Sequence, residues 1–160
     1  MIFLYVAGAI AGTLAVVYIA GSMIPEEHVA SVTADYAAAP ERIYAVISDA
    51  KKFLEWRTGL KSVEVKDGII TEVSGFGPMS YRFSEQVPAR RLVTADTGGK
   101  EKGWTGSWTF EIEPNGSGSR LTITERGRVF SPFFRLMSKL FFSHEETARR
   151  YHADLARRMS

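Results

Sequence analysis

The chain of 160 residues contains no cysteine. It can therefore form neither a disulfide nor a thiolate metal site. This absence leaves the compartment open, because a disulfide-free domain can fold on either side of a membrane. A large charge excess is missing too. The net charge of +2 provides no strong attraction to a polyanion, so we expect no nucleic-acid partner.

Charged side chains are also absent from residues 2–24, which consist mainly of aliphatic residues, alanine and glycine. An uncharged apolar run of about 18 residues or more predicts a membrane-spanning helix. The run is longer than the apolar core of a signal peptide, roughly 7–15 residues, and no basic side chain precedes it. We therefore interpret residues 1–24 as a retained transmembrane anchor rather than a cleaved signal.

Two features of this segment bear on its partners and orientation. Gly8 and Gly12 have the small-xxx-small spacing that lets two helices approach closely in lipid, so weak dimerisation is one interpretation. The alternative is that glycine is simply common in membrane spans. The first basic residue after the span is Arg42, which favours a single-pass protein with its domain on the non-cytoplasmic side.

The rest of the chain divides into a linker, residues 25–27, and one domain, residues 28–160, which is long enough to bury its own core. Alternation and turn residues predict a strand, two small helices, six strands, a short helix and a long final helix. Asp67-Gly68 is a strong hairpin signal, and strands joined by tight turns are antiparallel. The predicted strands are residues 28–36, 60–66, 69–74, 79–87, 90–97, 104–113 and 120–129.

This order predicts an α+β fold in which a curved antiparallel sheet of about seven strands wraps around the long C-terminal helix. A sheet with one apolar face needs a cover, and the last helix, which carries an apolar stripe, can supply it. One transmembrane helix precedes this domain.

Two carboxylates fall on apolar strand faces. Glu125 shares a face with Ile123, and a four-residue loop at residues 114–117 would place it across from Gly106. Arg57 is a plausible partner for Glu125. Glu85 has the same apolar register. Each carboxylate is either a polar anchor in a pocket or, as the plainer alternative, part of a structural ion pair or a solvated strand end.

The apolar segment 133–142 allows three interpretations: a lid over a pocket, an interfacial helix at lipid headgroups, or a plug at the open end of the sheet. We favour the plug. Enzyme signatures are mostly absent. His28, His144 and His152 are far apart in sequence, and His144 and His152 lack the spacing of a helical zinc pair, so we predict neither a metal site nor a cofactor.

Several stretches in this order resemble the START/polyketide-cyclase superfamily, also called SRPBCC, with the helix-grip fold of the birch-pollen allergen. The resemblance covers residues 28–159. It is carried by Leu54-Glu55-Trp56-Arg57, Arg90-Arg91-Leu92-Val93, Gly106-Ser107-Trp108-Thr109-Phe110, Leu121-Thr122-Ile123-Thr124-Glu125 and Ser131-Pro132-Phe133-Phe134-Arg135.

The resemblance implies a deep apolar cavity between sheet and helix that holds a lipid or another hydrophobic small molecule, and it carries over no catalytic residue. The leading hypothesis is therefore a membrane-tethered, non-catalytic binding protein. One alternative is a cyclase- or dehydratase-like enzyme with Glu125 as acid or base, and another is a protein-interaction module. The predicted ligand-binding residues are Trp56, Arg57, Tyr81, Phe83, Trp104, Trp108, Phe110, Ile123, Glu125 and Met137.

Overall fold

The computed structural model describes residues 1–75, 77–99 and 103–160. The sequence also predicts a polar, glycine-containing loop at residues 98–103, and part of it lies outside the described residues. The structure contains the predicted elements in the predicted order. The helices are α1 (Ile2–Ser22), α2 (Pro40–Ser48), η1 (Ala50–Lys52), α3 (Phe53–Trp56), α4 (Pro132–Phe141) and α5 (His144–Met159). The strands are β1 (Glu27–Tyr36), β2 (Leu60–Lys66), β3 (Ile69–Ser74), β4 (Gly77–Val87), β5 (Arg91–Asp96), β6 (Trp104–Asn115) and β7 (Gly118–Val129).

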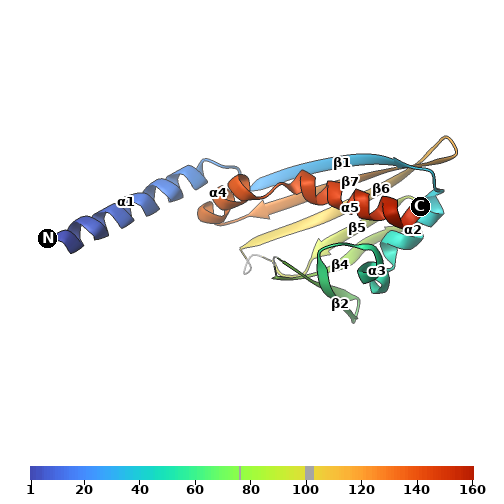
Figure 1. Ribbon diagram of the computed structural model, residues 1–160, viewed down its shortest axis with the longest axis horizontal. Coiled ribbons are helices and arrows are strands. Elements are labelled where there is room, and N and C mark those ends of the chain that lie inside the picture. Colours follow the sequence, from blue (N-terminus) through green and yellow to red (C-terminus); the bar gives the residue numbers. More distant parts are fainter. Residues whose placement is uncertain (76, 100–102) are drawn as a thin grey trace.

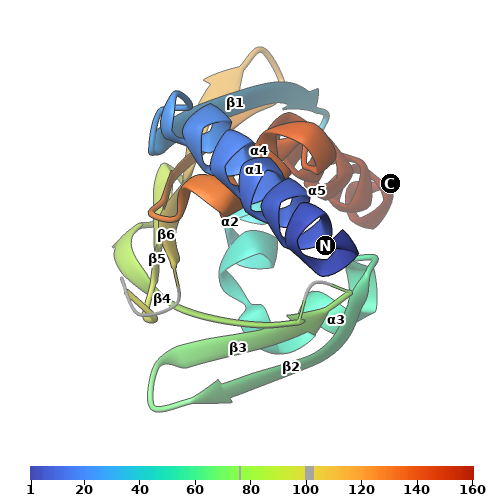
Figure 2. The ribbon, with the colours of Figure 1, turned by 90° about the vertical axis from the view of Figure 1, so that its left-hand side faces the viewer.

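The seven strands form a single antiparallel sheet in the order β1-β7-β6-β5-β4-β3-β2. Among the described strands, every pairing joins neighbours in sequence except β1–β7, in which β1 lies at one edge of the sheet. Figure 2 shows the sheet curving around α2 and α5, which lie inside the curve. The helix-grip fold expected from the sequence is therefore confirmed.

The core lies between the sheet and the helices. From α5, Ala148, Tyr151 and Leu155 are buried against the sheet, while α2 contributes Ile43 and Ile47. Ser143 caps the N-terminus of α5 by accepting a hydrogen bond from the Glu146 amide at 3.2 Å. This cap fixes where the long helix begins, and so which of its faces meets the sheet.

Helix α1 projects away from the domain at the end opposite the C-terminus (Figure 1). It is long and apolar enough to cross a membrane, and its apolar window is not buried by the rest of the chain. Its last turn rests directly on α4. A Cβ atom at Gly21 would lie 1.9 Å from the carbonyl oxygen of Pro132, so only glycine allows this approach.

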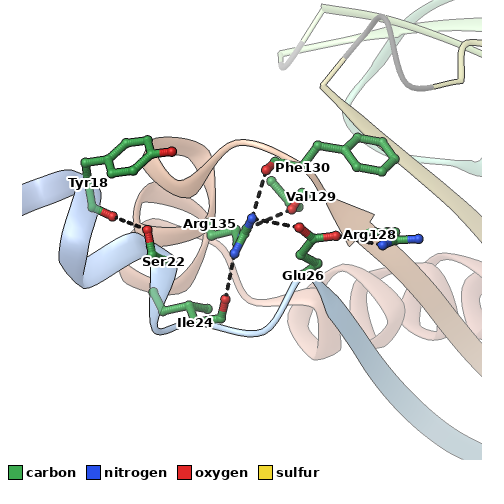
Figure 3. Close-up of polar contacts among 8 residues, drawn as sticks. All are labelled: Tyr18, Ser22, Ile24, Glu26, Arg128, Val129, Phe130 and Arg135. Atoms are coloured by element: carbon green, nitrogen blue, oxygen red, sulfur yellow. Dashed lines mark hydrogen bonds and ion pairs between the residues drawn. The ribbon is translucent and has the colours of Figure 1, made fainter.

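Arg135 of α4 fixes the joint between α1 and the domain (Figure 3). Its guanidinium donates hydrogen bonds to the carbonyl oxygens of Ile24, Val129 and Phe130 at 2.9–3.1 Å. It also donates to the Glu26 carboxylate at 2.9 Å. One side chain, only 10% exposed, thus ties the end of α1, the end of β7 and α4 together.

Helix α4 does not plug the sheet, contrary to our preferred interpretation. None of its residues is buried, and five large apolar side chains in and just after it are between 44% and 75% exposed: Phe133, Phe134, Leu140, Phe141 and Phe142. The reason is its position, since α4 packs mainly on α1, beyond the end of the sheet (Figure 1).

Two predicted registers are wrong. The β6–β7 turn has two central residues, because Asn115 pairs with Gly118, and this places Glu125 opposite Trp108 rather than Gly106. In β4, a register shift between Phe83 and Glu85 interrupts the alternation. Glu85 is therefore exposed and pairs with Arg91 at 3.2 Å, which agrees with the plainer interpretation of this carboxylate.

Candidate functional site

A buried polar cluster lies on the inner face of the sheet. Glu72 of β3 is 3% exposed, and its Oε1 accepts hydrogen bonds from the Arg57 guanidinium and the Tyr81 hydroxyl. Arg57 follows α3 directly, and Tyr81 lies on β4 beside β3. The sequence analysis predicted that Arg57 pairs with Glu125. The structure corrects this, because Glu72 neutralises Arg57 in the core.

Charge and burial set the protonation of this cluster. Burial raises the pKa of Tyr81 well above its usual range, and the neighbouring Glu72 carboxylate raises it further. Burial disfavours the Arg57 cation, but the charge and hydrogen bond of Glu72, together with Tyr151 and Tyr81, outweigh that effect and leave the pKa of Arg57 above its ordinary value. The arginine and the phenol therefore both remain protonated hydrogen-bond donors at neutral pH.

The sequence pattern did not identify Glu72, although a signal existed. It lies two residues after Ile70 in a strand that was predicted with its correct bounds, so the two side chains share the inner face. The alternation in β3 is weakly apolar, with threonine, valine and serine intermediate in exposure, and this hides the inward register.

Aromatic rings surround the cluster and fill much of the interior below α5. The Tyr151 ring stands between sheet and helix, with its centroid 5.2 Å from that of Trp56 and 5.3 Å from that of Phe110. Trp108 lies 6.0 Å away from the same ring. The Arg57 guanidinium carbon lies 5.0 Å from the Tyr151 ring centre, a cation–π contact.

An open groove of about 460 Å³ lies between η1 and the strands β2–β4. Ile70 and Phe83 contribute apolar surface to it, and Gln86 lies on its wall. The Phe83 ring contacts Tyr81 with centroids 6.4 Å apart. None of Arg57, Glu72 and Tyr81 lines this groove, and the groove lies beside η1 rather than between the sheet and α5, where the resemblance placed the cavity.

A second groove, of about 390 Å³, opens between α3 and α5. Trp56 and Arg57 line it together with Asp154, which accepts a hydrogen bond from the Thr58 amide at 2.7 Å. Trp56 Nε1 is buried and has no hydrogen-bond partner among the described residues. Such a buried donor without a protein partner is uncommon, and its hydrogen is available to an oxygen atom of water or of a ligand.

A different cluster surrounds Glu125. Its Oε1 lies 3.0 Å from His144 Nδ1 and 3.5 Å from His28 Nε2. The two imidazole rings are stacked, with centroids 3.7 Å apart. Burial raises the pKa of Glu125, but the contacts with His144 and His28 outweigh it and hold this pKa below its ordinary value. Glu125 is therefore ionised at neutral pH.

The predicted ligand-binding residues are thus divided by the fold. Trp56, Tyr81, Phe110 and Ile123 belong to the buried core. The remaining predicted side chains are partly exposed: Arg57, Phe83, Trp104, Trp108, Glu125 and Met137. Of all ten, Phe83 lines the larger groove, and Trp56 and Arg57 line the smaller one.

Residues 27–158 match the family model described as polyketide cyclase / dehydrase and lipid transport. The chain belongs to this family. No curated protein sequence matches the chain. The match leaves out α1, so the N-terminal apolar helix is an addition to the family domain.

Solved structures agree on the fold. A START superfamily protein from Mycobacterium smegmatis is 17% identical, with a TM-score of 0.64 over 82% of this chain and 97% of that chain. Norcoclaurine synthase from Thalictrum flavum is 15% identical, with a TM-score of 0.68 over 83% and 94%. The di-domain ARO/CYC protein StfQ of the steffimycin biosynthetic pathway is 10% identical, with a TM-score of 0.63 over 81% and 48%.

Proposed function

We propose that this protein holds a hydrophobic small molecule or lipid beside a membrane, without catalysing a reaction on it. The observation that carries the proposal is the groove of about 460 Å³ next to Ile70 and Phe83. Its volume lies in the range of small-molecule sites, about 300–1,000 Å³. Val65, Ile70 and Phe83 contribute apolar surface to it, and Ser48, Asp49, Lys51 and Gln86 supply the polar groups that would orient a ligand.

The membrane part of the proposal rests on α1 and α4 together. Helix α1 has the length and composition of a membrane span, and α4 packs against its last turn with aromatic side chains exposed. A helix with one face of this kind suits the boundary between headgroups and acyl chains. A protein partner could also cover such a face, but the contact with α1 favours lipid. The domain would lie on the non-cytoplasmic side.

The absence of catalysis is part of the proposal because Glu125, the candidate acid or base, lines neither groove. A cyclase- or dehydratase-like reaction that used Glu125 as general acid would need a protonated carboxyl near neutral pH. Its lowered pKa works against that role. The exposed Glu85 lies outside both grooves.

Photocrosslinking in liposomes tests this proposal on the full chain. A lipid analogue with a diazirine in its acyl chain is irradiated in vesicles that contain the protein, and the labelled peptides are mapped by mass spectrometry. Label in α1 provides an internal control for membrane contact. We expect additional label in the β4 peptide that contains Phe83. Label confined to α1 and α4 would overturn the proposal.

A pair of tryptophan substitutions makes the test specific. Gln86→Trp fills the larger groove, whereas Arg82→Trp adds the same bulk to an exposed position of the same strand outside that groove. We expect the first variant to lose most of the β4 label and the second to keep it. Equal labelling of the two variants would show that the probe does not occupy the groove.

A further inference from the structure

His28, Glu125 and His144 come from three separate elements and meet at one point. His28 is the second residue of β1, Glu125 lies on β7, and His144 is the first residue of α5. One ligand atom from each lies within 4.8 Å of the other two. Their separation in sequence hid this meeting, and nothing in the proposed ligand-binding function uses it.

The distances fit a transition-metal ion. Zinc binds imidazole nitrogen and carboxylate oxygen at about 2.0–2.2 Å, so two ligand atoms of a tetrahedral site lie roughly 3.4 Å apart. The Glu125 oxygen is already 3.0 Å from His144 Nδ1 and 3.5 Å from His28 Nε2. Rotation of the two stacked rings about their side-chain torsions would direct both nitrogens to one ion.

The surroundings favour the required tautomer and leave space for the rings. Ser138 Oγ lies 3.4 Å from His144 Nε2, so a hydrogen on Nε2 would leave Nδ1 free to face Glu125. The His28 ring lies over Gly127, where a Cβ atom would come within 2.2 Å of it. Glycine at position 127 is therefore what lets His28 reach Glu125.

His28 Nε2 adds an independent observation. It is buried and forms no hydrogen bond with any residue in the described parts of the chain, although Glu125 is nearby. A buried nitrogen with an unused lone pair or hydrogen calls for a partner. The three side chains are 17–29% exposed, so an ion can enter from solvent.

We propose that His28, Glu125 and His144 form a binding site for a divalent transition-metal ion of the zinc class, with an open fourth coordination position. Two imidazoles and one carboxylate are the donor set that suits such ions. The bound ion would join the beginnings of β1 and α5 to β7, at the end of the domain where α1 is attached.

The site is tested by titrating the full chain in detergent with ZnCl₂ or CoCl₂. A chelator first removes any bound metal. The protein must carry no histidine tag, and it has no cysteine to compete for the ion. We expect one equivalent of Zn²⁺ to bind in calorimetry, and one equivalent of Co²⁺ to give visible absorption bands of a nitrogen- and oxygen-ligated ion.

Matched histidine variants locate the ion. We expect His28→Ala and His144→Ala each to weaken binding at least tenfold, while His152→Gln, on the same helix as His144, leaves affinity and stoichiometry unchanged. Circular dichroism of each variant checks that it remains folded, and Glu125→Gln serves as a milder change if an alanine variant does not fold. Absence of stoichiometric binding, or equal binding by wild type and both alanine variants, would overturn the proposal.

Discussion

Two carboxylates on the inner face of the same sheet have opposite kinds of partner. Glu72 is 3% exposed and is bound by an arginine and a tyrosine, both of which remain protonated at neutral pH. Glu125 is 17% exposed and contacts the imidazole rings of His28 and His144. The first arrangement is a buried cluster in which each charged or polar group is paired, and the second is the more exposed group at which we propose a metal ion.

Their positions in the fold match this difference. Glu72 lies on β3, in the part of the sheet formed by β2–β4, and lines neither groove. Glu125 lies near the attachment of α1, where α5 begins. The two carboxylates thus differ in their surroundings at the two ends of the sheet, and the side chains that contact each carboxylate account for the difference.

The largest expected effect comes from Glu72→Gln, because it leaves the Arg57 cation in the core without a counter-charge. Removal of one partner of a buried ion pair costs about 3–5 kcal/mol of stability. Urea unfolding of the full chain in detergent measures it. Glu125→Gln should cost much less, since that site is more exposed.

The double variant Arg57→Met with Glu72→Gln sharpens this contrast. It removes both charges, so it should recover part of the stability lost in Glu72→Gln. If the two side chains did not interact, the stability losses of the two substitutions would add. A double variant that is even less stable than Glu72→Gln would therefore contradict the described pairing.

The second prediction compares Arg57 with Arg135, an arginine that is 10% exposed at the joint between α1 and the domain. Arg135→Met leaves three backbone carbonyl oxygens without their donor, which should cost about 2–3 kcal/mol at the joint between α1 and the domain. Hydrogen exchange should show the loss in residues 22–28 rather than in β3 and β4. Unchanged exchange at residues 22–28 would contradict the role of Arg135.

The third prediction concerns the space that Glu125 and its histidines require. Gly127→Ala introduces a Cβ atom into the His28 ring, so we expect His28 to be displaced, with a cost of about 1–3 kcal/mol. Gly75→Ala is the matched control, because no heavy atom lies within 4 Å of its added Cβ. Thermal unfolding of the two variants should differ, and equal values would count against the close packing at Gly127.

The smallest expected effect involves His152, the buried counterpart of the two stacked histidines. Burial lowers the pKa of His152, and its Nδ1 lies 2.7 Å from the Tyr36 hydroxyl. Because the folded pKa is below the unfolded value near 6.5, the stability contribution is complete above that pH and is lost as the pH falls through the folded pKa.

His152→Gln should therefore lose less stability on acidification from pH 7 to pH 5 than the wild type does, with the other histidines present in both proteins. Thermal melts across this range measure the difference. Parallel pH profiles would show that His152 is not kept neutral by burial.

Local patterns in the sequence predicted the elements closely. The hairpin signal Asp67-Gly68 and the alternation around it gave β2 and β3 with their observed bounds, and the uncharged stretch gave α1 to within two residues. These features depend on neighbours along the chain, and a single sequence shows them directly.

The site could not be predicted as well, because it depends on register and distant contacts. One bulge near Phe83 moved Glu85 outward, and a shorter turn moved Glu125 by two positions along β6. His28 and His144 meet only because β1 pairs with β7 beneath the start of α5. Alternation alone also could not show which inward carboxylate Arg57 would neutralise.

Native mass spectrometry of the full chain released from lipid nanodiscs tests the proposed function most directly. The account predicts that the wild type and Arg82→Trp retain a bound hydrophobic molecule, and that Gln86→Trp is released without it. Wild-type protein that carries no bound molecule, or that retains it equally when the groove is filled, would contradict the account.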